Sequence, residues 1–163
     1  MTTPHLDRLH VQVARRMDAP ALAALNQVVQ QMHHEWSGSE YLPPDPRAAE
    51  DFFLAKVADA SAVVLVAFRT GHPVGFLYAQ EMHRPPNPFT SELRVLYVEQ
   101  VVVLPEKRRS GVGRALFHAA ERAARARGLD EVRLETAAVN ASAQAFFDRL
   151  GYSPYSVRLR KGM

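Results

Sequence analysis

Cysteine is absent from all 163 residues of the sequence. Disulfide bonds, thiolate metal sites and a cysteine nucleophile are therefore excluded, and with the nucleophile any acyl-cysteine intermediate. Long apolar runs are also missing, because none approaches the roughly 18 residues that suggest a membrane-spanning helix. Residues 1–10 lack the apolar stretch of a secretory signal, so we expect a cytoplasmic protein with no membrane partner.

Neither sign of charge is in large excess. Lysine and arginine number 20 against 17 aspartates and glutamates, which gives a formal net charge of +3. Such a balance does not by itself indicate a nucleic-acid partner. The length predicts one domain, residues 1–163, and a hydrophobic fraction of 47% is enough for a core.

The positive charge is concentrated in residues 106–127. This segment has a local balance of +5, whereas the rest of the chain sums to −2. An anionic partner is therefore expected at this segment. Its basic residues are Lys107, Arg108, Arg109, Arg114, Arg122, Arg125 and Arg127.

Apolar periodicity outlines the secondary structure, because alternation predicts strands and a 3–4-residue spacing predicts helices. In the first half these patterns predict a strand at 9–15, helices at 18–34 and 45–58, and a hairpin of strands at 62–68 and 73–82. After a proline-rich loop they predict a strand at 94–103, a helix at 111–128, a strand at 131–136, a helix at 140–150 and a last strand at 155–160. Asp18, Asp45 and Asn140 are the predicted helix caps. This order indicates a mixed α/β domain on one sheet.

The strongest local signal is a basic turn between the 94–103 strand and the next helix, which opens with Gly111-x-Gly113. A helix N-terminus has unpaired N–H groups and a partial positive charge, so the turn is suited to a pyrophosphate. The spacing matches neither the dinucleotide fingerprint nor the P-loop. The alternative interpretation is a glycine-rich connection with a solvated basic face.

Two stretches of the sequence stand out together. The first is VEQVVVLPEKRRSGVGRALFHAAERAARARG, residues 98–128, and the second is residues 140–152, with Asn140, Phe146-Phe147 and Leu150-Gly151-Tyr152. Together they resemble the GNAT superfamily of acetyl-CoA-dependent N-acetyltransferases. The resemblance covers about residues 10–160 in element order. It implies a single domain with a central, mostly antiparallel mixed sheet of about six to seven strands and about four helices.

The resemblance also implies where acetyl-CoA, the expected co-substrate, would bind. Its pyrophosphate would lie on the backbone amides of residues 109–114, and its pantetheine arm would add as a pseudo-strand to the strand at Val101, which splays from its neighbour at a bulge. The N–H near Val101 would polarise the thioester carbonyl. The implied cofactor-binding residues are Val101, Val102, Val103, Arg108, Arg109, Ser110, Gly111, Val112, Gly113, Arg114, Asn140 and Phe147; no metal is expected.

Acetyl transfer to an amine needs a base, since an alkylammonium has a pKa near 10.4. Glu99 lies in the same strand, and period-2 geometry would place it on one face with Val101 and Val103. Glu135, which ends the 131–136 strand, is the second candidate. For each, the alternative role is a solvated or salt-bridged charge at the rim.

The sequence differs from the family at the position of the general acid. A tyrosine often stands where this sequence has Phe147, which has no proton to give. Tyr152 and Tyr97 are the candidate substitutes, with a packing role as the alternative for Tyr152. Unassisted departure of the CoA thiolate is also chemically reasonable, because thiols have a pKa near 8.5.

The acceptor would contact the loop between the first two helices and the proline-rich loop, as in the family. Glu35, Trp36 and Tyr41 are the candidate substrate-binding residues, since carboxylates and aromatic rings suit a cationic amine. An ordinary polar loop is the alternative. The adjacent His33 and His34 indicate a metal only weakly, because no third ligand stands at a telling spacing.

The leading hypothesis is an N-acetyltransferase that acts on a primary amine of a small molecule or peptide, by direct transfer in a ternary complex. The alternative is a non-catalytic acyl-CoA-binding regulatory protein on the same fold. A nucleic-acid-binding module is disfavoured, because the helix after Gly111 has an apolar stripe without interleaved aromatic residues. Dimers are common on the fold, so a homodimer is compatible with the sequence.

Overall fold

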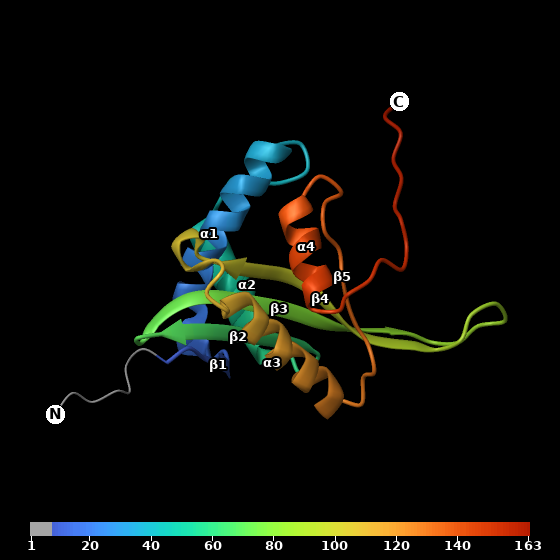
Figure 1. The fold of residues 1–163 in the computed structure, drawn as a ribbon, viewed down its shortest axis with the longest axis horizontal. Helices are drawn as coiled ribbons and strands as arrows, with labels where there is room; N and C mark the ends of the chain where they lie inside the picture. The colour runs from blue at the N-terminus through green and yellow to red at the C-terminus, as the bar shows by residue number, and fades with distance from the viewer. Residues whose placement is uncertain (1–7) are drawn as a thin grey trace.

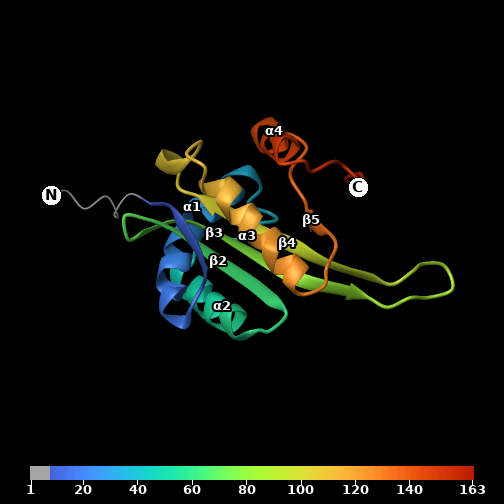
Figure 2. The ribbon, with the colours of Figure 1, turned by 60° about the horizontal axis from the view of Figure 1, so that its bottom comes forward.

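The computed structural model describes residues 8–163, so the first seven residues of the predicted domain lie outside the described part. Within it, five strands form one sheet in the order β1-β2-β3-β4-β5. Helices α1 and α2 cover one face and helix α3 covers the other (Figures 1 and 2). The predicted class, a single mixed α/β domain, is confirmed, while the strand count in residues 8–163 is five rather than six or seven.

The first four strands form an antiparallel meander. They are β1 (His10–Val13), β2 (Ala62–Arg69), β3 (His72–Arg84) and β4 (Leu93–Val103). The predicted hairpin between β2 and β3 is confirmed, and its turn places Thr70 and Gly71 at φ values of 50° and 78°. The short β5 (Val132–Leu134) pairs parallel to β4 and completes the sheet.

Two helices cover one face of the sheet. Helix α1 (Ala19–Trp36) and helix α2 (Pro46–Ala58) bury Leu22, Leu25 and Phe53 against the middle strands. Asp45 caps α2 as predicted, because its side chain accepts a 3.0 Å hydrogen bond from the Ala48 N–H. Asp18 does not cap α1 with its side chain; its carboxylate accepts from the Arg15 N–H instead, across a 3-10 turn at Arg16–Asp18.

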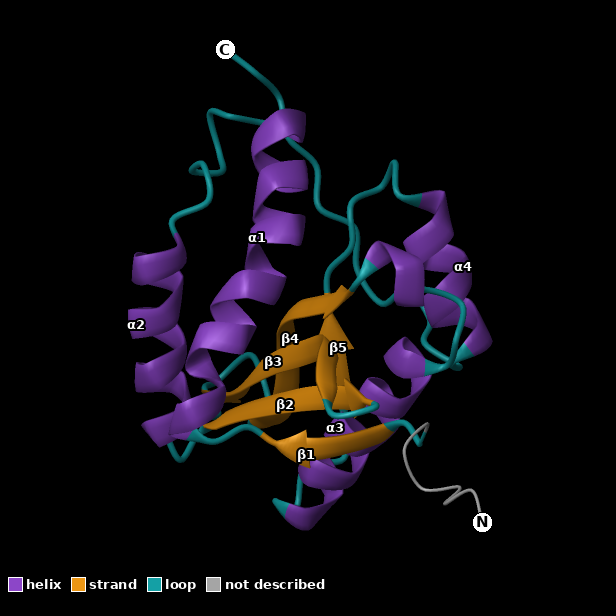
Figure 3. Cartoon of the chain, turned by 90° about the vertical axis from the view of Figure 1, so that its left-hand side faces the viewer, coloured by secondary structure: helices purple, strands orange, loops and turns teal. Residues whose placement is uncertain are grey.

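The other face carries helix α3 (Val112–Ala126) and helix α4 (Ala141–Arg149), on the opposite side from α1 and α2 in Figure 3. Leu116 and Phe117 of α3 are fully buried against the sheet. The ring of Phe117 meets the rings of Phe146 and Phe147 of α4 edge to face, at 5.9 and 5.3 Å. This packing fixes the position of α4 relative to the start of α3.

The predicted last strand at 155–160 is wrong. Its backbone makes no strand pairing in the structure, and Val157 and Leu159 are 81% and 93% exposed. The tail is held by side chains, since Arg133 stacks on the ring of Tyr155 and Arg158 lies 3.3 Å from Glu135. Alternation alone does not make a strand where no sheet edge is paired with it.

The proline-rich connection after β3 is an arm that projects beyond the body of the sheet (Figure 1). Strands β3 and β4 continue into it as far as Arg84 and Leu93, so its base is regular rather than a loop. At the tip the Asn87 side chain accepts hydrogen bonds from the Phe89 and Thr90 N–H groups, and Phe89 is 93% exposed. No helix in residues 8–163 combines the length and apolar character needed to cross a membrane.

Candidate acetyl-CoA and acceptor site

Strand β4 parts from β5 halfway along its length. The parallel pairing ends at Val98 and Leu134, and β4 continues for five residues, Glu99 to Val103, beyond that point. On the other side, Tyr78 pairs with Gln100 and Ala79 pairs with Val98, so Glu99 is the extra residue of a bulge. In residues 8–163 no strand pairs with this free edge of β4, which leaves backbone groups open to a ligand in extended form.

The turn before α3 presents a second set of free backbone groups. Gly111 has a φ of 87° and Arg109 a φ of 60°, both left-handed. Within the described chain, the N–H groups of residues 109–114 have no recorded acceptor. Six N–H groups at one helix N-terminus form a donor set that fits the phosphates of a nucleotide cofactor.

The basic residues do not all lie at this turn, contrary to the expectation for the whole 106–127 segment. Lys107, Arg108, Arg109 and Arg114 are within or beside it. The others are in the last turns of α3, roughly 15–20 Å further on at 1.5 Å per residue. There Arg127 donates to the carbonyl oxygens of Ala60 and Ala62, which is a structural role.

A further cation, which the sequence analysis missed, comes from β2. Arg69 Nη2 donates a 3.0 Å hydrogen bond to the carbonyl oxygen of Ser110, and its Nε is buried without a partner in residues 8–163. Arg69 is 41 residues from Ser110, so local pattern gave no signal of this contact.

Helix α4 adjoins the same turn. Asn140 caps it as predicted, accepting a 3.0 Å hydrogen bond from the Ala143 N–H. A Cβ at Gly113 would lie 3.0 Å from Phe146 Cζ, so the glycine allows α4 to approach the first turn of α3. Phe147 is only 9% exposed and lies in the core, where its ring supports this packing.

The candidate acid and base residues gather near β5. Tyr97 Oη lies 3.3 Å from Glu135 Oε2, and the guanidinium of Arg158 lies 3.3 Å from the same oxygen. Partial burial raises the pKa of Tyr97, and the charges of Glu135 and, to a smaller degree, Glu99 raise it further. Tyr97, Glu135 and Arg158 therefore form one cluster, and Glu99 stands two residues from Tyr97 in β4.

The bulge changes the expected direction of Glu99. Val101 and Val103 pack towards the core under α3. Glu99 is exposed, and its charge acts on Lys56 of α2 on the other face. The prediction that Glu99 shares one face with the two valines is wrong, because a bulge interrupts the two-residue alternation.

Tyr152 is not part of this cluster. Its hydroxyl lies 3.2 Å from Glu121 of α3, and its ring packs against Phe117. Burial, followed by the charge of Glu121, raises the pKa of Tyr152 well above its usual range. These contacts give it a packing role.

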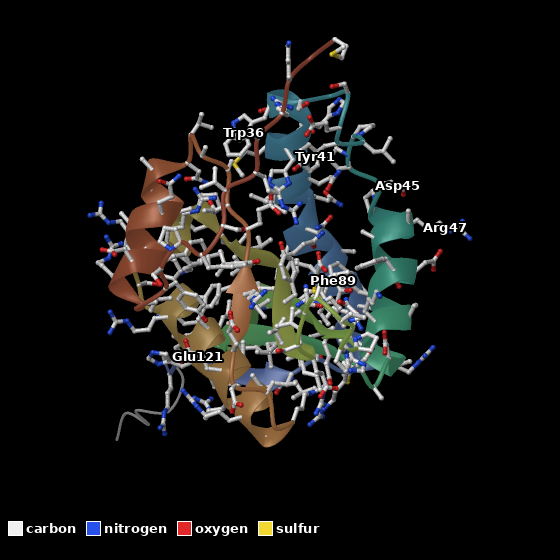
Figure 4. All side chains as sticks on the ribbon, turned by 90° about the vertical axis from the view of Figure 1, so that its right-hand side faces the viewer. Trp36, Tyr41, Asp45, Arg47, Phe89 and Glu121 are labelled. Carbon is white, nitrogen blue, oxygen red and sulfur yellow. The ribbon has the colours of Figure 1, made fainter. Side chains whose placement is uncertain are left out.

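The expected acceptor loop lies at the end of α1. The ring of His33 lies between Trp36 and Tyr41, with ring centroids 5.8 and 4.7 Å away, and Figure 4 shows Trp36 and Tyr41 at the same end of the helix. Glu35 is exposed and accepts a hydrogen bond from Gln31. Arg160 of the tail lies 2.7 Å from Glu40 of the loop.

Asn26 is another residue that the sequence analysis missed. It lies on the buried side of α1 and donates a 3.0 Å hydrogen bond to Gln100 of β4. The signal was an asparagine on the apolar stripe of the predicted helix, three residues before Val29. Among residues 8–163, no three histidine, aspartate or glutamate side chains gather as a metal site would require.

Comparison with known proteins places these features in a family. Residues 29–152 match the Acetyltransferase (GNAT) family. Aminoglycoside N(6')-acetyltransferase type 1 of Klebsiella aerogenes is 33% identical over 103 residues, which is 63% of this chain and 66% of that protein. Mycothiol acetyltransferase of Salinispora arenicola (strain CNS-205) is 33% identical over 102 residues, 62% of this chain but only 32% of that protein. The chain thus spans about a third of the mycothiol acetyltransferase it matches.

Solved structures share the fold. The tetramutant of BH1408 protein from Bacillus halodurans has a TM-score of 0.87 at 21% identity, over 94% of this chain and 99% of that one. AAC(6')-Iy in complex with the bisubstrate analog CoA-S-monomethyl-acetylneamine has a TM-score of 0.75 at 21% identity, over 96% and 99%. The family match covers well over half of the sequence. The chain therefore belongs to the acetyltransferase (GNAT) family.

Proposed function

We propose that this protein transfers the acetyl group of acetyl-CoA to a primary amine of a small molecule or peptide, directly within a ternary complex. The observation that carries the proposal is the parting of β4 from β5 after Val98, together with the free N–H groups of residues 109–114 in the turn and first turn of α3. The family membership and the named acetyltransferase relatives support it.

The chain's own groups fit the co-substrate in two places. The N–H groups of residues 109–114 would hold the pyrophosphate, with Arg108, Arg109 and Arg114 adding charge. The free edge of β4 at Val101 to Val103 would pair with the extended pantetheine arm. Val102 and Val112 have buried side chains, so they would contribute backbone groups alone. Bound acetyl-CoA supplies the activated acyl group.

The proposed base stands at the bulge of β4, next to the edge that would hold the pantetheine arm. Glu99 would accept the proton from the acceptor ammonium, directly or through water, and leave the amine nitrogen free to attack the thioester carbon. A C–N bond then forms, the nitrogen gives up its second proton to water, the C–S bond breaks, and CoA leaves as its thiolate. Tyr97, held by Glu135, would donate a proton to that thiolate. Glu35, Trp36 and Tyr41 would form the outer wall for a cationic acceptor.

One observation favours a second candidate, a non-catalytic acyl-CoA sensor. Phe147 occupies the position of the expected general acid, and the neighbouring Tyr152 hydroxyl is engaged by Glu121. Such a sensor would bind acetyl-CoA through the same groups without turning it over.

Two measurements separate the candidates. Calorimetric titration with acetyl-CoA is expected to give a dissociation constant in the micromolar range or below, and absence of binding would overturn both. A thiol-detection screen over aminoglycosides, polyamines, amino acids and peptide N-termini should then reveal amine-dependent release of CoA. Binding without release over the full panel would favour the sensor.

A further inference from the structure

Apart from tyrosine, Asn26 is the only side chain with a polar group that the structure buries in residues 8–163, with 8% of its surface exposed. It lies among Leu22, Leu25 and Val29 on the inner side of α1. A polar group in such surroundings costs free energy unless it is hydrogen-bonded. The hydrogen-bond partners of Asn26 therefore decide whether its burial is favourable.

The single partner of Asn26 is Gln100. Asn26 Nδ2 donates a 3.0 Å hydrogen bond to Gln100 Oε1, and within the described chain Asn26 Oδ1 and Gln100 Nε2 have no recorded protein partner. The pair thus keeps one free acceptor oxygen and one free donor nitrogen. Exchanging the nitrogen and oxygen of both amides leaves the same inventory.

The two amides form one side of a hollow between α1, α2 and β4. Phe52 of α2, 40% exposed, also lines it and meets the rings of Phe53 and Tyr78 edge to face at 5.4 and 5.5 Å. The hollow has a volume of about 130 Å³ and is lined by Asn26, Ala49, Phe52, Phe53 and Gln100. Aromatic rings and a pair of amides with hydrogen-bonding atoms available to a ligand therefore line the same hollow.

The hollow opens beside the proposed reaction centre. Gln100 stands between the bulge residue Glu99 and Val101, the first residue of the proposed pantetheine edge. Glu99 is exposed and directly precedes Gln100, whose side chain lines the hollow. An acceptor whose amine reaches Glu99 would therefore extend its adjoining part into the hollow.

We propose that this hollow binds the part of the acceptor next to its amine, and that Asn26 and Gln100 select a neutral group that both donates and accepts a hydrogen bond, a hydroxyl or an amide. A carboxylate has no donor for Asn26 Oδ1, and a second ammonium has no acceptor for Gln100 Nε2. An alkyl group leaves both amides unpaired. The inference rests on the proposed N-acetyltransferase function and names the acceptor class of that site.

Two series of amines test the selection. Phenylalaninamide, phenethylamine and phenylalanine share a frame and differ in one group, while 6-amino-6-deoxyglucose and cyclohexylmethylamine form the corresponding hydroxyl pair. The amines differ in basicity, so their kcat/KM values are not compared directly. The deciding quantity is the preference, which is the ratio of kcat/KM for the neutral polar amine to kcat/KM for its counterpart, compared between wild type and variant. In wild type that preference should exceed the preference in Asn26→Leu by about tenfold or more in at least one series.

The variants carry their own controls. Gln100→Leu should reduce the preference as Asn26→Leu does, whereas Gln27→Leu, a neighbouring amide of α1 with no recorded side-chain hydrogen bond, should retain it. Melting temperature and acetyl-CoA titration verify folding and cofactor binding. Amine-dependent CoA release with an unchanged preference in both leucine variants overturns this inference alone; absence of release with every amine overturns the proposed function.

A measurement on the wild-type protein covers the case in which the leucine variants fail to fold. Calorimetric titration in the presence of CoA should show phenylalaninamide or 6-amino-6-deoxyglucose binding about tenfold more tightly than its apolar counterpart. Equal affinities in both pairs overturn the inference.

Discussion

Arg69, the last residue of β2, donates a hydrogen bond to the carbonyl oxygen of Ser110 in the turn before α3, over a distance of 3.0 Å. The contact joins the β2–β3 hairpin to the loop whose N–H groups are the proposed phosphate site. Ser110 is further fixed by its own hydroxyl, which donates to the carbonyl oxygen of Lys107. The turn is thus held from two sides.

Arg69→Ala should weaken acetyl-CoA binding. The substitution removes a charged hydrogen bond of about 1.5–3 kcal/mol from the turn and a cation from its surroundings, so we expect the dissociation constant to rise about tenfold or more. The Michaelis constant for the acceptor should stay unchanged. Arg84→Ala is the charge-matched control, because Arg84 is an exposed arginine at the end of β3 away from the β2–β3 turn. Equal effects of the two variants in calorimetry would contradict the positioning role of Arg69.

Two substitutions of Gly111 separate the effect of an added charge from the effect of backbone strain. Its φ of 87° is strained for any other residue, although a Cβ there would meet no atom within 4 Å. Gly111→Glu and Gly111→Gln should therefore lose about 1–2 kcal/mol of stability alike. Because the carboxylate competes for the anion site, Gly111→Glu alone should abolish acetyl-CoA binding. Equal residual affinities, measured by calorimetry on variants with matched melting temperatures, would refute the phosphate assignment.

Glu99 is the proposed base, and Glu99→Gln tests it. The substitution keeps the size and removes the proton acceptor, so kcat should fall by about 10²–10⁴ while acetyl-CoA affinity is retained. Glu135→Gln provides the comparison from the neighbouring cluster. An unchanged kcat in Glu99→Gln would assign the role to Glu135 or to water.

Tyr97 and Tyr152 differ in what their hydroxyls contact, which predicts different losses. Tyr97→Phe removes the group beside Glu135 and should lower kcat about tenfold or more. Tyr152→Phe removes the contact with Glu121 and should lower the melting temperature more than kcat. The pKa of Tyr97 is raised above its ordinary range, mainly by burial, so its hydroxyl stays protonated and its contribution should be constant between pH 6 and 9. Steady-state rates at several pH values check both expectations.

His33 should give the acceptor loop a pH dependence. Partial burial between Trp36 and Tyr41 lowers the pKa of His33 below its ordinary value near 6.5. A base with a lowered folded-state pKa stabilises the fold above its ordinary pKa, and this contribution is lost as the pH falls through the folded value. Trp36 is the only tryptophan of the chain, so its fluorescence should titrate below pH 6.5. His33→Gln should remove the transition and His34→Gln should retain it; the opposite pattern would contradict the assignment.

The sequence predicted the features that depend on local pattern. The cap at Asp45, the β2–β3 hairpin and the glycine turn at Gly111 all follow from residues a few positions apart, and all are confirmed. The family resemblance implied a bulge in this strand near Val101, but its position at Glu99 could not be obtained from the sequence, because two strands decide the register together. The Arg69–Ser110 and Asn26–Gln100 contacts join residues 41 and 74 positions apart, where periodicity carries no information.

The predicted sixth strand at 155–160 is wrong for a different reason: the local pattern is present, but the strand does not form. The alternation there is as regular as in the confirmed strands, but strand formation depends on pairing as well as on pattern. The edge of β5 is only three residues long, and the tail contacts it through Arg133 and Arg158 rather than through backbone hydrogen bonds.

The central claim is that acetyl-CoA binds to backbone amides left free at two places, the β4 edge and the turn before α3. Amide hydrogen exchange with and without acetyl-CoA measures those amides directly. We predict slower exchange at Val101, Val103 and residues 109–114 on binding. We predict no change at Val102, whose amide faces β3, or in β2, whose amides are already paired with its neighbours. Unchanged exchange at both places at a saturating concentration of acetyl-CoA would contradict the account.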